Sequence, residues 1–194
     1  MIPRQLLVGI AVMIVLVIAL GFYFRQMQRL VYEPEPAADT LPVTPPPTGA
    51  TETVTLYVAN DEAGELRGQS AQIPLPGGRQ QRAEELLRSL LRIYQLPGAA
   101  HPLTAASEIR SIYLVEPGAA VIDLNAAFAD QHRSGILVEQ LTVNSLVETL
   151  AVNVPGVQRV RILVDGKTRD TLAGHADLTE FFDVQTVSQA VAGQ

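Results

Sequence analysis

The chain has 194 residues, of which 47% are hydrophobic and only 18% are charged, and its mean hydropathy is +0.19. It contains no cysteine, which excludes disulfides, thiolate metal sites, cysteine nucleophiles and a lipid-modified cysteine. Its net charge of −6 argues against binding to nucleic acid, because proteins that bind nucleic acid are normally basic. The positive hydropathy of an acidic chain indicates that part of it contacts lipid.

Residues 1–32 are predicted to form an N-terminal membrane anchor. The run Leu6–Phe24 has 19 residues and no charge, and as a helix it would be roughly 28 Å long, close to the thickness of a bilayer core. The alternative is a cleaved signal peptide. Signal peptides have shorter apolar cores, and Phe22, Tyr23 and Phe24 before Arg25 are typical of a membrane interface. We expect a single-pass helix with a cytoplasmic N-terminus, which places the C-terminal domain outside the cytoplasm, on the periplasmic or cell-wall side.

Residues 33–51 are predicted to form a linker, because the stretch is rich in proline. Proline fixes φ and removes a backbone donor, so neither helix nor sheet is expected there. At about 3.1 Å per residue, the extended linker would reach up to roughly 60 Å. We interpret it as a spacer. The alternative is a ligand for a proline-binding domain.

Residues 52–183 are predicted to form one α+β domain, followed by a C-terminal tail at 184–194. Alternating apolar and polar residues predict a strand at Thr53–Ala59, and a weaker pattern predicts another at Glu65–Leu75. In Gln80–Gln95 the apolar residues recur at the spacing of one helix face.

The second half of the domain repeats this order of strands and helix. The elements predicted there are the strands Ile109–Val115 and Ala119–Leu124, the helix Ser134–Asn153, the strand Val157–Val164 and, after a tight turn, the strand Thr168–Leu172. Ser134 is expected to be the N-cap of the second helix. The predicted architecture is a small mixed β-sheet with two helices packed on one face.

No motif in the sequence indicates catalysis. The three histidines, His101, His132 and His175, do not show the spacing of a zinc site. His175 and Asp177 would share a face in a strand, but two ligands do not make a metal centre. Asp123 is expected to be an ordinary surface acid on the outward face of a strand. No second carboxylate can be placed opposite it, so a paired-acid mechanism is unsupported. We therefore predict no enzyme activity, no cofactor and no metal.

Six short runs, in this order and spacing, resemble the GerMN domain of bacterial sporulation and germination proteins. They are Val54–Val58, Arg82–Leu87, Val121–Asn125, Val143–Leu150, Pro155–Gly166 and Gly174–Glu180. The resemblance implies a compact α+β module related to the ring-building motif. It also implies an exported domain that is tethered to the cell envelope and is not known to be an enzyme. This chain carries one copy, whereas spore-forming relatives often carry two.

The expected function is that of a membrane-anchored, envelope-facing, non-catalytic module that binds an envelope protein or a second copy of itself. The alternatives are a module that binds peptidoglycan or another cell-wall polysaccharide, and a hydrolase with a cryptic metal site at His175 and Asp177. The family-motif residues proposed as contact sites are Asp123, Pro155, Gly156, Asp165, Gly166, Gly174, His175, Asp177 and Leu178.

Overall fold

The computed structural model describes residues 50–193. The chain divides into two compact units, Met1–Pro47 and Thr48–Gln194, and every element below belongs to the second. The predicted membrane span Leu6–Phe24 and nearly all of the linker lie outside the described residues. Within residues 50–193, no helix has both the length and the apolar character that crossing a bilayer requires.

The described residues form an α+β domain of strands and helices. They are β1 (Thr51–Asn60), β2 (Glu65–Pro74), α2 (Arg79–Tyr94), β3 (Ile109–Val115), β4 (Ala119–Leu124), α3 (Ala126–Asp130), α4 (Ile136–Asn153), β5 (Arg159–Val164), β6 (Phe182–Asp183) and α5 (Val184–Ala192).

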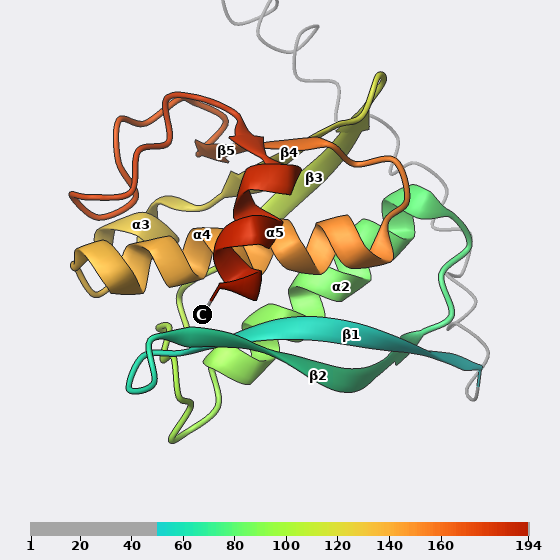
Figure 1. Ribbon diagram of the computed structural model, residues 1–194, viewed down its shortest axis with the longest axis horizontal. Coiled ribbons are helices and arrows are strands. Elements are labelled where there is room, and N and C mark those ends of the chain that lie inside the picture. The colour runs from blue at the N-terminus through green and yellow to red at the C-terminus, as the bar shows by residue number, and fades with distance from the viewer. Residues whose placement is uncertain (1–49, 194) are drawn as a thin grey trace, which may run out of the picture. The chain divides into compact units, whose positions relative to one another are not determined.

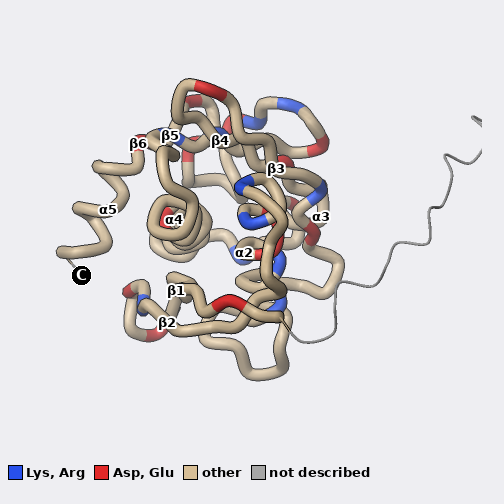
Figure 2. The backbone as a smooth tube through the Cα atoms, turned by 90° about the vertical axis from the view of Figure 1, so that its right-hand side faces the viewer, with Lys and Arg blue, Asp and Glu red and all other residues tan. Residues whose placement is uncertain are grey.

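The strands form two sheets. β1 and β2 pair as an antiparallel hairpin, and the other strands form a second sheet in the order β3-β4-β5-β6. β4 and β5 are parallel, whereas β3 and β6 run antiparallel to their neighbours. Helices α2 and α4 form a layer between the two sheets (Figures 1 and 2). The prediction of one small mixed sheet was therefore incomplete. The helices do cover one face of the four-stranded sheet, but the hairpin covers their other side.

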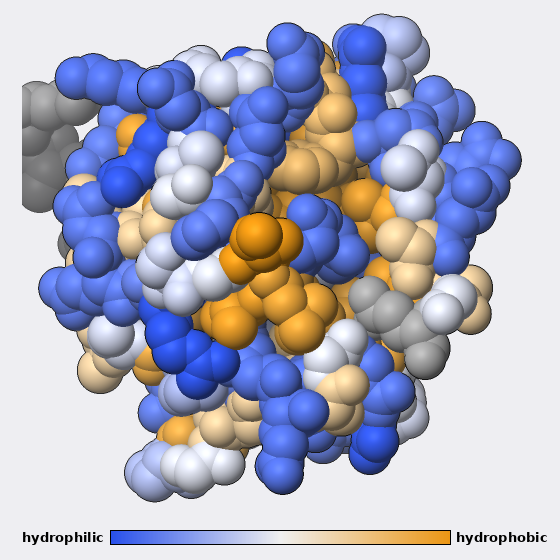
Figure 3. Space-filling view, turned by 60° about the vertical axis from the view of Figure 1, so that its left-hand side comes forward, coloured by the Kyte–Doolittle hydropathy of each residue, from blue (hydrophilic) through white to orange (hydrophobic). Residues whose placement is uncertain are grey.

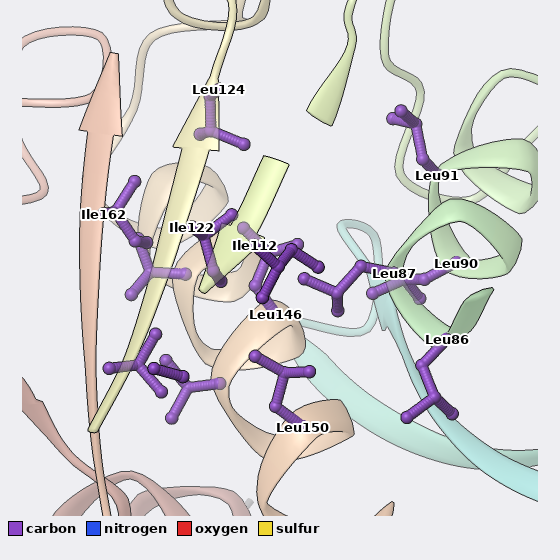
Figure 4. Packing of buried hydrophobic residues seen from close by; sticks show 14 of the residues in the cluster. Leu86, Leu87, Leu90, Leu91, Ile112, Ile122, Leu124, Leu146, Leu150 and Ile162 are labelled. Carbon is purple, nitrogen blue, oxygen red and sulfur yellow. The ribbon is translucent and has the colours of Figure 1, made fainter. Parts of the chain in front are cut away.

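The core lies where the helices meet the four-stranded sheet. On β4 and β5, alternate residues such as Ile122 and Ile162 are fully buried, which is the period expected of strands with one covered face. Figure 4 shows Leu146 and Leu150 of α4 beside these strands, with leucines of α2 on the other side. The apolar face predicted for α2 is confirmed, since each of its apolar positions from Ala83 to Tyr94 in that pattern is buried.

Two local predictions were wrong. The helix predicted from Ser134 begins at Ile136, with Gly135 at the N-cap position and no side-chain cap. The strand predicted at Thr168–Leu172 does not form, although the tight turn before it does, with positive φ at both Asp165 and Gly166. The segment instead folds back on its own loop, with an isolated bridge between Thr171 and Asp177 and a hydrogen bond from the Leu172 N–H to the Ala176 carbonyl.

The C-terminal residues 184–194, which the sequence analysis treated as a tail, contain the helix α5. The Asp183 side chain caps it by accepting a hydrogen bond from the Thr186 N–H at 2.9 Å. Val187 is buried, and Ser188 Oγ donates to Glu148 Oε2 of α4 at 2.6 Å. The helix thus closes one side of α4, as Figure 2 shows.

Candidate functional site

The first polar cluster surrounds the carboxylate of Glu139, which lies in the first turn of α4 and is fully buried. Its Oε2 accepts hydrogen bonds at 2.9 Å from the backbone N–H groups of Ala173, His175 and Ala176. Its Oε1 accepts from the Gly135 N–H at 3.1 Å and lies 2.9 Å from His175 Nδ1. One carboxylate therefore joins the start of α4 to the loop that follows β5.

These hydrogen bonds decide the charge of Glu139. Burial is the largest single effect and raises the pKa of this carboxyl group, but the hydrogen bonds from Ala176, His175 and Ala173 together outweigh it and lower the pKa to about 2. The carboxylate is ionised at neutral pH, and all its partners are fixed by the fold. It is a structural anion with no free oxygen for a substrate or a metal.

Ser134, His175 and Glu139 together resemble a hydrolase triad in composition but not in geometry. Ser134 Oγ lies 3.3 Å from His175 Nδ1, and Glu139 Oε1 lies 2.9 Å from the same nitrogen. A catalytic histidine needs the acid on one ring nitrogen and the hydroxyl on the other, so that it can take the hydroxyl proton. Because both groups contact Nδ1, this arrangement does not activate Ser134.

The second polar cluster contains two buried histidines that share the hydroxyl of Thr142. His101 Nε2 and His132 Nε2 each lie 2.7 Å from Thr142 Oγ1. His101 Nδ1 lies 2.5 Å from Asp61 Oδ1, and Asp61 Oδ2 in turn lies 2.7 Å from Arg133 Nη2. The cluster joins the β1–β2 turn, the loop between α2 and β3 and the loop between α3 and α4 to helix α4.

The proton count of this second cluster is restricted. His101 Nδ1 faces a carboxylate and His132 Nδ1 faces the carbonyl oxygen of Arg133, so both nitrogens act as donors. The Thr142 hydroxyl has one proton, and the Val138 carbonyl oxygen, 3.1 Å away, is a further acceptor for it. The hydroxyl therefore donates to at most one Nε2, and bonding of both rings requires a second proton on at least one of them. Burial is the largest effect on the pKa of both rings and lowers both, whereas Asp61 acts in the opposite direction at His101. The cluster has a carboxylate for one imidazolium and none in contact with His132.

The structure places the predicted contact residues in three separate groups. The first group, Asp123, Asp165 and Gly166, lies where the neighbouring strands β4 and β5 end. Asp123 was predicted to be a surface acid, but it is buried, and its Oδ1 accepts from the Gly166 N–H at 2.7 Å. The second group, Pro155 and Gly156, follows the last turn of α4. There the Pro155 carbonyl accepts a hydrogen bond from Arg79 Nη2 at 2.8 Å.

The third group, Gly174, His175, Asp177 and Leu178, lies in the loop that contacts Glu139. His175 and Asp177 do not meet, since Asp177 Oδ1 accepts instead from the backbone and hydroxyl of Thr179 at 2.7 and 2.6 Å. Leu178 is fully buried. Among residues 50–193 there is no group of three or more metal-ligating side chains.

A row of polar side chains on α4 forms hydrogen bonds with the backbone at the outer edge of β1. Asn153 bonds both backbone groups of Thr55, accepting from its N–H at 3.3 Å and donating to its carbonyl at 2.7 Å. Thr149 Oγ1 accepts from the Tyr57 N–H at 3.0 Å, and Ser145 Oγ donates to the Tyr57 carbonyl at 2.7 Å. These side chains take the place of a neighbouring strand, which explains why β1 does not join the larger sheet.

The outer face of the four-stranded sheet is open. We use the term open sheet face for Tyr113, Val115, Arg159, Arg161 and Phe181. Tyr113, Val115 and Phe181 are 56%, 49% and 43% exposed. The guanidinium carbons of Arg159 and Arg161 lie 4.9 and 5.5 Å from the centre of the Phe181 ring, a cation–π geometry.

The sequence analysis missed Glu139, the shared hydroxyl of Thr142 and the polar row on α4. One signal was available: Ser145, Thr149 and Asn153 recur every four residues and therefore lie on one face of a helix that is otherwise apolar. The distant partners of Glu139 lie 34 to 37 residues away in the sequence, and His101 lies 41 residues from Thr142. No local pattern indicates these contacts.

A family model for "Germane: Sporulation and spore germination" matches residues 55–170. The chain belongs to this family. The match begins within β1, extends past the end of β5 and includes both polar clusters except for the loop residues after 170. It confirms the resemblance found in the sequence. No match to this chain was found among curated proteins.

One solved structure has a similar fold at low sequence identity. The tandem GerMN domains of the sporulation protein GerM from Bacillus subtilis are 18% identical, with a TM-score of 0.53 over 71% of this chain and 48% of that chain. This chain thus spans about half of the tandem structure. The first GerMN domain of the same protein is 16% identical, with a TM-score of 0.46 over 67% of this chain and 95% of that chain. A Clostridium perfringens protein provisionally classed as a lipoprotein is 20% identical, with a TM-score of 0.47 over 72% of this chain and 91% of that chain.

Proposed function

We propose that this Germane-family protein is a membrane-anchored, envelope-facing, non-catalytic module that binds an envelope protein or a second copy of itself. The proposal includes a single-pass helix at Leu6–Phe24 with its N-terminus in the cytoplasm. Membership of a family that is not known for enzymes supports a binding role, and the saturated carboxylate of Glu139 leaves its cluster without a free catalytic group.

The observation that carries the proposal is the open sheet face. Tyrosine, phenylalanine and arginine are the residues enriched at the centres of protein interfaces, because they bury a large area while losing little conformational freedom. Here they stand on a rigid sheet, and the two arginines are already ordered over the Phe181 ring. Binding through this face would lose little further side-chain entropy.

The experiment is cross-linking of the full chain in intact membranes, with a double variant Tyr113→Ser/Phe181→Ser. We expect the variant to lose the cross-linked adduct by at least about tenfold, as for removal of two hot-spot residues. The matched control is Ile136→Ser/Leu137→Ser, because these residues are 75% and 50% exposed at the start of α4. Figure 3 shows apolar side chains gathered on the side of the molecule that carries this helix start.

The control decides which surface is used. An adduct that survives in the sheet variant but disappears in the α4 variant would overturn the role of the open sheet face. Absence of any protein adduct, together with sedimentation of the full chain on purified peptidoglycan, would replace the proposal with binding to a wall polymer.

A further inference from the structure

Strand β3 forms one edge of the four-stranded sheet, and a groove of about 270 Å³ runs between this edge and α2. Helix α2 lines the groove with Glu84, Arg88 and Leu91. The opposite side is lined by Ile109 and Ile112 of β3 and by Glu108, which precedes β3. Leu91 and Ile112 are buried and form an apolar floor, whereas the charged residues form the rim. A strand edge beside a helix is the geometry in which an extended peptide can add to a sheet.

The side chain of Gln80 already occupies part of this edge. Its Nε2 donates to the Ile112 carbonyl, and its Oε1 accepts from the Leu114 N–H at 3.3 Å. These are the bonds that the main chain of a neighbouring strand would make. Gln80 is exposed at the start of α2, so its carboxamide is held by these contacts and can leave without disturbing the core.

The edge that Gln80 covers is only partly satisfied. In an antiparallel pair the N–H and C=O of one residue point to the same side, so the Ile112 N–H and the Leu114 carbonyl face outward together with the groups that Gln80 binds. On this outward side, neither the Ile112 N–H nor the Leu114 carbonyl has a hydrogen-bond partner among residues 50–193. On β1, by contrast, both backbone groups of Thr55 and of Tyr57 are bonded to α4 side chains.

The charges of the groove indicate what kind of segment fits. Arg88 is paired with Glu85, and Arg110, which also lines the groove, is paired with Asp165 at 3.1 Å and lies 3.8 Å from Asp123. Glu84 accepts only a neutral hydrogen bond from Gln80, and neither Glu84 nor Glu108 has a cationic partner among the described residues. The unpaired charge of the groove is therefore negative.

We propose that the β3 edge binds an extended segment of a partner protein as an added strand, with Gln80 as the group that the segment displaces. The segment alternates apolar side chains, which reach the floor at Leu91 and Ile112, with lysine or arginine side chains that meet Glu84 and Glu108. This site is separate from the open sheet face, and the proposal does not depend on the proposed function of that face.

The test uses the full chain in detergent and a fluorescein-labelled probe, Val-Lys-Val-Lys-Val-Lys-Val with blocked ends, measured by fluorescence anisotropy. We expect binding that tightens about threefold in Gln80→Ala, because the displaced amide is gone, and weakens about tenfold in Glu84→Gln/Glu108→Gln. Amide hydrogen exchange at Ile112 should slow in the complex, a change that charge attraction alone does not produce.

Two control peptides and one control variant make the outcome decisive. Replacing the central lysine by proline removes a backbone donor and should abolish binding, and the same probe with glutamate in place of lysine should bind at least about tenfold more weakly. Phe181→Ser, on the open sheet face, should bind the probe as the wild type does. No binding to wild type and Gln80→Ala, or equal binding of the proline peptide, overturns the proposal.

Discussion

The two central helices, α2 and α4, differ in where their polar residues lie. Helix α2 buries one apolar face and presents arginines and glutamates such as Arg88 and Glu85 to solvent. Helix α4 is enclosed by two sheets, by α5 and by the loop after β5. Its polar residues Glu139, Thr142, Ser145 and Thr149 are buried as completely as Leu141, Leu146 and Leu150.

The difference shows that a polar residue on a helix has two distinct meanings. On α2 exposed arginines such as Arg88 mark the solvent side. On α4 a polar residue marks a place where a backbone edge or a loop ends against the helix and needs a hydrogen-bond partner. The structural importance of a polar residue therefore follows from the number of backbone groups it satisfies, and substitutions of the same kind should differ sharply in cost between the two helices.

The largest expected effect is that of Glu139→Gln. The variant loses the charge that the loop donors stabilise and turns an amide donor toward some of them, so the free energy of unfolding should fall by about 3 kcal/mol. Urea denaturation measures this. The control is Glu85→Gln on α2, where a partly exposed pair with Arg88 is lost, at less than about 1 kcal/mol. Equal losses in the two variants would refute the comparison.

A smaller effect is expected for Asn153→Ala. It leaves the Thr55 N–H and carbonyl without their side-chain partners, and we expect a loss of about 2 kcal/mol in the free energy of unfolding. Gln80→Ala is the matched control, because it removes an amide that bonds a strand edge in the same way, but from the exposed start of α2. There the loss should stay below about 1 kcal/mol, since water replaces the amide.

The pH dependence should separate the two clusters on α4. Burial lowers the pKa of His101 and His132, so the unfolded chain binds more protons below about pH 6.5 and the stability falls as the pH falls. The contribution of Glu139 is fully present above its ordinary pKa of 4.5 and is lost only as the pH falls toward 2. Stability measured between pH 7.5 and 5 should decline less steeply in His132→Gln, and an identical slope would contradict the role of His132.

The smallest effect is expected for Asp177→Asn, which lies on the loop but outside the contact with α4. The hydrogen bonds of Thr179 to its Oδ1 lower the pKa of this exposed carboxyl group, but they close only a local turn. The midpoint of thermal unfolding should stay the same within error. A shift comparable to that of Glu139→Gln would show that the whole loop, and not its contact with α4, carries the stability.

The parts of the fold that follow from local sequence patterns could be predicted. The period of α2, the alternation in β1 and the Asp165-Gly166 turn are local patterns, and the structure confirms each of them. The strand expected at Thr168–Leu172 does not form because this segment folds back on its own loop, where the Leu172 N–H bonds to the Ala176 carbonyl. The residues that follow it bond to Glu139, which lies more than 30 residues away in the sequence. The division into two sheets was missed for the same reason, since it depends on α4 side chains replacing a strand beside β1.

The candidate site was less accessible to sequence reasoning than the fold. Gly174 and His175 were singled out as candidate contact residues, but the backbone donors of this loop turn inward to Glu139. A contact with a partner through the run stays a prediction. The open sheet face depends on Tyr113 of β3 and Arg161 of β5 pairing through β4, which no local pattern specifies. Exposure becomes visible only after the strands are placed.

The polar row of α4 has a mechanical consequence. A pull from the N-terminal side of the domain enters at Thr51, which pairs with Pro74 at the open end of the β1–β2 hairpin. A hairpin held only by its ladder would peel apart from that end, one bond at a time. Because Asn153, Thr149 and Ser145 hold β1 along its other edge, the load passes into the central helix of the domain. A domain built in this way can transmit tension through its first strand without unravelling from it.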